Sequence, residues 1–143
     1  MTTDLLELEA QVDGLYDASP DKPLSSGLSG ATDTIEAFIS LLEGGQVRAA
    51  TRAKDGKWVA VPWVKRGILL AFRFGSVVAT TGSEGGDVPD GVGSAFFDKD
   101  TLPLRRFMAK DRVRIVPGGS AVRRGAYLAP GVVCMPPMYV NAG

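Results

Sequence analysis

The sequence predicts an α+β N-terminal domain, built of helices and a β-hairpin, followed by the first coils of a left-handed parallel β-helix. Three patterns support this prediction. Apolar residues recur at steps of three and four in the first part of the chain, as in amphipathic helices. Two short strand-like runs flank an Asp-Gly dipeptide, and a period of six runs from Val116 onward. We assign residues 1–112 to the first domain and residues 113–143 to the start of the β-helix.

Two amphipathic helices are expected near the N-terminus. The first covers residues 2–17, and its apolar stripe consists of Leu5, Leu8, Val12 and Leu15. Residues 19–30 are rich in Pro, Gly and Ser, which predicts a connecting loop. The second helix begins near Asp33, whose carboxylate can accept from free backbone amides while Glu36 reaches back in a capping box. The buried stripe of this helix is Ile35, Phe38, Ile39 and Leu42, and the helix ends at Gly44 and Gly45.

A hairpin and a third helix are predicted next. Asp55-Gly56 tolerates the positive φ angles of a tight turn between two strands. Pro62 can open a helix, because the missing N–H costs nothing in the first turn. One face of this helix carries Val64, Ile68 and Phe72, and its polar side carries Lys65, Arg66 and Arg73. A basic helix face could bind a phosphate or a coenzyme, but charges opposite an apolar stripe usually form a solvated face, which we expect here.

The segment between the third helix and the period of six has few large apolar groups. Residues 75–93 are rich in glycine, which predicts a mobile surface loop apart from a short strand near Val77. Residues 96–107 predict a packed turn that leads into the repeats.

Three positions repeat every six residues in the last part of the chain. The apolar inward position holds Val116, Val122, Leu128, Cys134 and Val140. The corner position holds Gly119, Gly125, Gly131, Pro137 and Gly143, and the position after the corner holds Ser120, Ala126, Val132 and Met138. In a triangular solenoid, each hexapeptide forms one flat side and one corner, and three hexapeptides complete a turn. Two ordinary strands with glycine turns are the alternative, but three positions agree over five repeats.

The composition excludes several classes of function. Sixteen Lys and Arg balance sixteen Asp and Glu, so no global field attracts nucleic acid or anionic lipid. The chain has no histidine, which removes the commonest general base and metal ligand, and we expect no bound metal. The single Cys134 cannot form an internal disulfide. With no apolar leader and no run of about 20 apolar residues, the sequence predicts a cytoplasmic protein without a membrane span.

Several segments resemble those of the bacterial tetrahydrodipicolinate N-succinyltransferases of lysine and diaminopimelate biosynthesis. These segments are LLEGGQVRAA, DGKWVAVPWVKRGILLAFR, FFDKD and RIVPGGSAVRRGAYLAPGVVCMPPMYVNAG. The glycine-rich stretch 76–94 looks longer than usual for this family, which indicates an insertion. The resemblance implies the N-terminal half of an enzyme that transfers succinyl from its co-substrate succinyl-CoA to the amino group of tetrahydrodipicolinate. It also implies a homotrimer, with both substrates bound between subunits and no metal or resident cofactor.

The resemblance assigns one substrate-binding residue, Arg114, which precedes the first hexapeptide. A guanidinium can hold a substrate carboxylate through two parallel hydrogen bonds, which a lysine cannot do. Without the resemblance, a solvated arginine at a strand edge would be the more ordinary interpretation. Met135, Tyr139 and Asn141 are weaker candidates for the same cleft, because Met and Tyr at hexapeptide positions more often serve packing. Cys134 occupies an inward position, which predicts a buried thiol rather than a nucleophile.

The resemblance places the acidic catalytic residues and the coenzyme groove after the Tyr-Val-Asn-Ala-Gly match. We therefore expect the catalytic residues beyond Gly143 and little activity from this chain alone. Because one coil needs about eighteen residues, the repeats form only about one and a half coils, which indicates a fragment or one part of a split enzyme. The alternative is a non-catalytic assembly module that needs a partner chain. A carbonic anhydrase of the hexapeptide type is disfavoured, because it requires zinc-binding histidines.

Overall fold

The computed structural model describes residues 4–18, 30–80 and 96–143, and within these ranges it is an α+β structure, as predicted. The helices are α1 (Leu5–Ala18), α2 (Ala31–Glu43) and α3 (Pro62–Phe74), with a short 3₁₀ turn, η2, at Ala109–Asp111. Antiparallel hairpins are formed by β1 (Ala50–Arg52) with β2 (Trp58–Ala60), and by β3 (Val77–Thr80) with β4 (Phe96–Lys99). Parallel pairs are formed by β5 (Arg114–Ile115) with β7 (Val133–Cys134), and by β6 (Ala121–Val122) with β8 (Tyr139–Val140). None of the described helices is long and apolar enough to cross a membrane.

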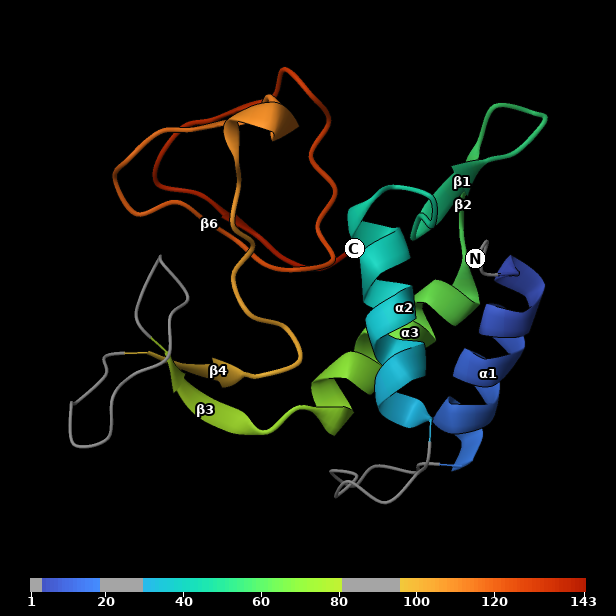
Figure 1. Cartoon of the computed structure of the whole chain (residues 1–143). Coiled ribbons are helices and arrows are strands. Elements are labelled where there is room, and N and C mark those ends of the chain that lie inside the picture. The colour runs from blue at the N-terminus through green and yellow to red at the C-terminus, as the bar shows by residue number, and fades with distance from the viewer. Residues whose placement is uncertain (1–3, 19–29, 81–95) are drawn as a thin grey trace.

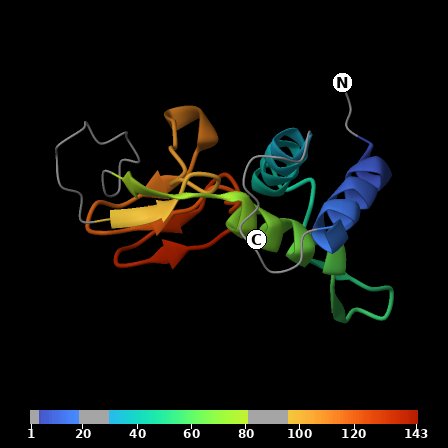
Figure 2. The same cartoon turned by 90° about the horizontal axis from the view of Figure 1, so that it is seen from below.

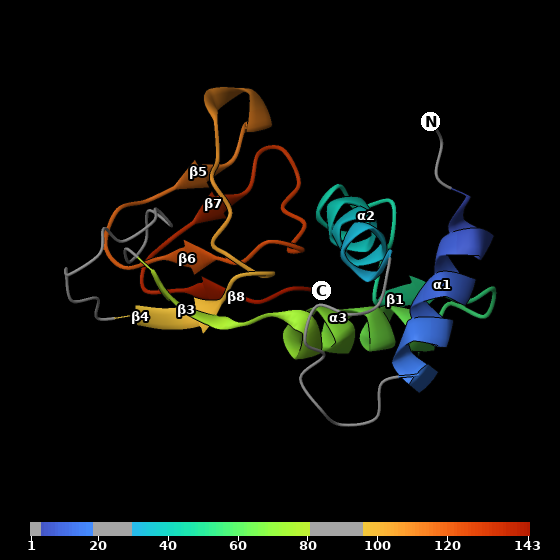
Figure 3. The same ribbon diagram turned by 60° about the horizontal axis from the view of Figure 1, so that its bottom comes forward.

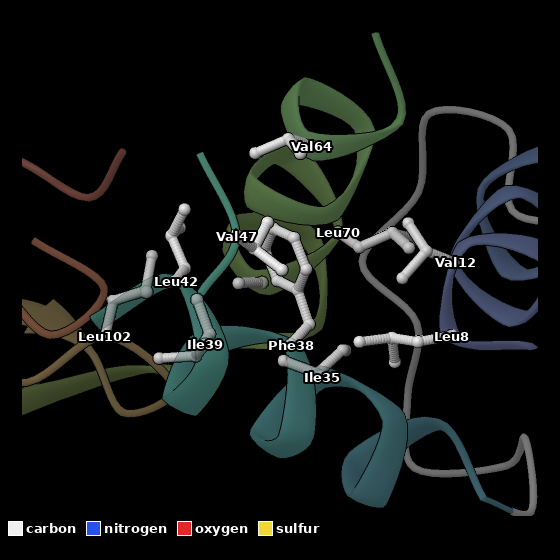
Figure 4. Packing of buried hydrophobic residues seen from close by; sticks show 11 residues of the cluster. Leu8, Val12, Ile35, Phe38, Ile39, Leu42, Val47, Val64, Leu70 and Leu102 are labelled. Carbon is white, nitrogen blue, oxygen red and sulfur yellow. The ribbon is translucent and has the colours of Figure 1, made fainter. Parts of the chain in front are cut away.

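The hydrophobic core lies where the three helices meet (Figure 1). Phe38 of α2 is fully buried at its centre, and its ring makes an edge contact with Trp63 at 5.6 Å between centroids. Figure 4 shows side chains from all three helices converging on this ring. The buried cluster is Leu8, Val12, Ile35, Phe38, Ile39, Leu42, Val47, Val64, Leu70, Ala71 and Leu102. All four residues of the predicted α2 stripe therefore belong to the core.

The predicted start of α2 is wrong by two residues. Gly30, with φ of 83°, precedes the first helical residue, and no side chain caps this end. Asp33 lies within the first turn, and Glu36 bonds to Arg124 instead of reaching back to the backbone. Gly30 adopts a left-handed conformation without strain, so it takes the position before the helix that the sequence predicted for the capping carboxylate of Asp33. The predicted start of α3 at Pro62 is confirmed.

The buried faces of α1 and α3 differ in part from their predicted stripes. Leu5 is 44% exposed, because it lies in the first turn of α1, beyond the helices that cover Leu8 and Val12. On α3 the most buried positions are Val64, Gly67, Leu70 and Ala71, whereas Ile68 and Phe72 are only partly buried. α3 contacts both α1 and α2, so its buried arc is wider than a single stripe (Figure 2).

The basic side of α3 is not a purely solvated face. Arg66 donates to Asp13 of α1 at 2.9 Å, and its guanidinium lies 5.5 Å from the ring of Tyr16. Arg73 lies over the same ring at 4.3 Å, whereas Lys65 is exposed. Two of the three cations therefore hold α1 against α3. The local sequence pattern could not reveal these partners, because they lie on another helix.

The hairpin around Asp55-Gly56 and the strand near Val77 are confirmed. Residues 96–99 form strand β4, whereas the sequence predicted a packed turn from residue 96. Its partner β3 is separated from it in the sequence by residues 81–95, so the local sequence alone does not reveal the pairing. The predicted loop at 19–30 lies outside the described residues except for Gly30, and most of the predicted loop at 75–93 lies outside them too.

The parallel strands repeat with almost the predicted period. Val122 pairs with Val140, eighteen residues later, but Cys134 pairs with Ile115, nineteen residues earlier. The predicted inward position of Val116 is therefore displaced by one residue, because an extra residue lies between the first two repeats. Val122 and Cys134 are buried as predicted. The corner glycines Gly119, Gly125, Gly131 and Gly143 all have positive φ, the conformation that favours glycine.

Candidate functional site

Arg114, the substrate-binding residue implied by the resemblance, lies on the exposed side of β5. Its backbone is held by pairing with Val133 and by a 3.0 Å hydrogen bond from its N–H to the carbonyl of Val132. Its side chain is exposed, and within the described part of the chain the guanidinium has no ion-pair or hydrogen-bond partner. A backbone held by strand pairing and an unpaired guanidinium suit an arginine that binds a carboxylate.

The four residues suggested for one cleft are divided between two sheets. Met135, 61% exposed, follows β7, the strand that pairs with the strand of Arg114. Tyr139 and Asn141 lie in or just after β8, which pairs with β6 (Figure 3). The structure therefore groups Met135 with Arg114 and places Tyr139 and Asn141 beside Arg123. Cys134 is 7% exposed, as expected for a buried thiol.

Arg123 is a buried cation that the sequence analysis missed. It is 8% exposed and donates to a carboxylate oxygen of Asp98 on β4 and to Oδ1 of Asn141, the latter at 3.1 Å. Its guanidinium also lies 5.0 Å from the ring of Phe72 and 5.8 Å from that of Tyr139. Arg123 thus joins the β3–β4 hairpin to the last described strand. The sequence pattern placed Arg123 at an outward position next to the inward Val122 and so did not indicate its burial. The strand that covers it, β4, comes from a distant segment.

A second arginine cluster fixes the position of the repeats on α2. Arg124 donates to both carboxylate oxygens of Glu36, at 2.8 and 3.0 Å. The backbone N–H of Gly125 donates to Glu43 at 3.1 Å, and the same carboxylate lies 3.6 Å from Arg105. Hydrogen bonds from Arg124 hold the pKa of the Glu36 carboxyl below its usual value, and Glu36 in turn raises the pKa of Arg124. These contacts hold the chain at Arg124 and Gly125 against α2.

A small pocket of about 140 Å³ lies between α2 and the last residues. Its lining residues are Leu42, Val47, Arg48, Ala126, Tyr127, Val140, Asn141 and Gly143. Arg48 lies 4.0 Å over the ring of Tyr127 and is already engaged there. Arg114 does not line this pocket. Among the described residues no group of three or more Cys, Asp or Glu is arranged to hold a metal ion.

Comparison with known proteins supports the resemblance. Residues 7–74 match the family model described as tetrahydrodipicolinate N-succinyltransferase N-terminal. A 2,3,4,5-tetrahydropyridine-2,6-dicarboxylate N-succinyltransferase from Paramagnetospirillum magneticum is 37% identical over 141 residues, which is 95% of this chain and 46% of the relative. The enzyme of the same name from Nitrobacter hamburgensis is 36% identical over 97% of this chain and 47% of its own length. The one from Salmonella typhi is 36% identical over 78% of this chain and 38% of its own.

The chain spans about half the length of the first curated relatives it matches. The resemblance inferred from the sequence is therefore confirmed for the N-terminal half of these enzymes. The matched ranges include both the helices and the repeats, since they extend over nearly the whole chain.

Proposed function

We propose that this chain, as a relative of the N-terminal half of tetrahydrodipicolinate N-succinyltransferases, supplies the substrate-side framework of such an enzyme. The observation that carries the proposal is the 37% identity over 141 residues to a protein of that name. The whole enzyme would transfer succinyl from succinyl-CoA to the amino group of tetrahydrodipicolinate, in lysine and diaminopimelate biosynthesis. It would work in the cytoplasm as a homotrimer, with succinyl-CoA as a co-substrate and no metal.

We further propose that residues 113–143 begin a left-handed β-helix and that residues 1–112 form a separate domain. The parallel pairs at offsets of eighteen and nineteen residues support a coil of three hexapeptides. The positive φ angles of the four glycines at the corner positions support its corners, and the fifth corner position is Pro137. The hydrogen bond from Gly143 to the carbonyl of Gly125 extends the same spacing beyond β8.

In this proposal Arg114 binds a carboxylate of the cyclic dicarboxylate substrate. Its exposed guanidinium can donate two parallel hydrogen bonds, and the paired strand fixes the point from which they are donated. Water adds across the C=N bond of the substrate ring to give an amine, which then attacks the thioester carbonyl of succinyl-CoA. An acidic residue takes the proton from the amine, the C–S bond breaks, and CoA leaves as the thiol while an amide forms. In the relatives we expect this acidic residue after the stretch that matches Tyr139–Gly143.

Release of the CoA thiol, followed with a thiol reagent, tests the proposal. The substrate would be a tetrahydrodipicolinate analogue, given to the 143-residue chain alone and to a fusion with the C-terminal half of the Paramagnetospirillum magneticum relative. We expect release from the fusion and none above background from the chain alone. Equal activity from the isolated chain would contradict the location of the catalytic residues, and an inactive but folded fusion would count against the function.

Substitution of Arg114 in the fusion tests its role. Arg114→Ala should raise KM for the dicarboxylate at least about tenfold while KM for succinyl-CoA changes little, because one charge-assisted carboxylate contact is lost. Arg114→Lys should recover only part of the loss, since an ammonium cannot form the two parallel bonds. Lys110→Ala, at an exposed cation of η2, is the matched control. An unchanged dependence on the dicarboxylate in Arg114→Ala would remove Arg114 from the site.

A further inference from the structure

The β1–β2 hairpin presents an exposed aromatic surface. All six residues of its two strands are exposed, including Trp58 at 73% and Val59 at 47%. The hairpin is nevertheless well defined, because Arg52 bonds to the carbonyl of Gly56 at 3.0 Å and the strands pair in full register. An isolated two-stranded hairpin is only marginally stable in water. Exposed tryptophans on such an element are typical of interfaces.

The charge of the hairpin indicates what kind of surface could cover it. Between residues 50 and 60 it carries Arg52, Lys54 and Lys57 against the single carboxylate of Asp55. Lys57 and Asp55 are 3.4 Å apart, with both side chains largely exposed, so this pair contributes little. An acidic surface with exposed apolar groups would therefore complement the hairpin.

Helix α1 presents such a surface. Residues 4–18 contain five carboxylates and no Lys or Arg. Of these, Glu7 and Asp17 are exposed, whereas Asp13 is paired with Arg66. Leu6 is 77% exposed on the same helix, and a Cβ added at Gly14 would meet no atom within 4 Å. The solvent side of α1 is thus acidic and apolar, and it is open enough for a large side chain to approach.

We infer that the hairpin of one copy of this chain docks on the solvent side of α1 of a second copy. Trp58 is 73% exposed in the structure, and the basic hairpin and the acidic solvent side of α1 are complementary in charge. If each copy places its hairpin on α1 of the other, the contact closes as a two-fold dimer, and otherwise it closes into a ring or extends as a filament. A nucleic acid is a poorer occupant, because the whole chain has no net charge. The inference does not depend on the proposed acyl transfer.

A charge-swap experiment tests this contact in the 143-residue chain. The hairpin variant is Lys54→Glu/Lys57→Glu, and the helix variant is Glu7→Lys/Asp17→Lys. In sedimentation velocity over a range of concentrations, the unsubstituted chain should self-associate, and each variant alone should associate at least about tenfold more weakly because like charges face each other. An equimolar mixture of the two variants should restore association, since opposite charges meet again, and raised salt should weaken it.

Several results would overturn the inference. The unsubstituted chain could stay monomeric at every concentration, the variants could associate as strongly as the unsubstituted chain, or the mixture could fail to restore association. Binding of an oligonucleotide that depends on Lys54 and Lys57, without self-association, would instead assign the hairpin to a polyanion. Trp58→Ala should weaken association about tenfold, whereas Val77→Ala, at a 64% exposed position on the other hairpin, should not. Circular dichroism establishes that each variant is folded.

Discussion

Gly67→Ala in the middle of α3 sets two effects of opposite sign against each other. Alanine is the better helix former by about 1 kcal/mol. A Cβ at this position, however, would lie 2.6 Å from Cζ of Phe38 and 2.7 Å from Cε1 and Cε2. The ring cannot swing aside, because Phe38 is fully buried and packed edge-on against Trp63. Overpacking of this kind costs about 1–3 kcal/mol, so we expect a net loss of roughly 1 kcal/mol in the free energy of unfolding.

Gly14→Ala is the matched control, because Gly14 lies within α1 and no atom lies within 4 Å of its added Cβ. Only the gain in helix propensity acts there, so this variant should be stabilised by roughly 0.5–1 kcal/mol. Urea unfolding followed by circular dichroism gives both free energies. In a Phe38→Leu background the cost of Gly67→Ala should shrink or change sign. A stabilised Gly67→Ala chain, or the same cost in both backgrounds, would refute the reasoning.

Three further predictions concern the contacts that hold the repeats. The hydrogen bond from Arg124 lowers the pKa of Glu36 in the folded chain. The stabilisation from this pair is therefore present above the pKa that Glu36 has in the unfolded chain, and it is lost as pH falls through the pKa of Glu36 in the folded chain. When the pH is lowered from about 7 to 3, the free energy of unfolding should therefore decrease less in Glu36→Gln than in the unsubstituted chain, as measured by urea titrations. Gly45→Ala should lower the melting temperature, because φ is +79° and the added Cβ would lie 2.8 Å from the ring of Tyr127; an unchanged midpoint would contradict this. Cys134 should react with a thiol reagent in denaturant much faster than in buffer, because only unfolding exposes it, and equal rates would show an open thiol.

The elements predicted correctly are those with a strong local pattern. The α2 stripe around Phe38, the turn at Asp55-Gly56 and the start of α3 at Pro62 each depend on residues within one turn or hairpin. Their physical causes act between neighbours in the chain, so the sequence shows them directly. The period of six is also local, and it led to both the expected parallel pairing and, with other segments, the family resemblance.

Predictions were wrong where the deciding partner is distant in sequence. Strand β4 forms because β3 pairs with it, and Asp98 on β4 then meets Arg123, which a local pattern would leave in solvent. Glu36 was assigned to a capping box, but Arg124 competes for it from 88 residues away. A charge-assisted bidentate pair satisfies the carboxylate better than one backbone amide does.

For the candidate site, the sequence by itself determined which residue to examine only through the family resemblance, which assigns substrate binding to Arg114, the arginine before the first repeat. It also determined the helical and repeat elements through periodicity, which needs only neighbouring residues. Only the tertiary structure decided that the guanidinium of Arg114 is unpaired among the described residues, that Met135 rather than Tyr139 shares its sheet, and that Ile115 stacks on Cys134. These outcomes depend on strand register and on which distant side chains become neighbours, and both are settled when the elements pack together.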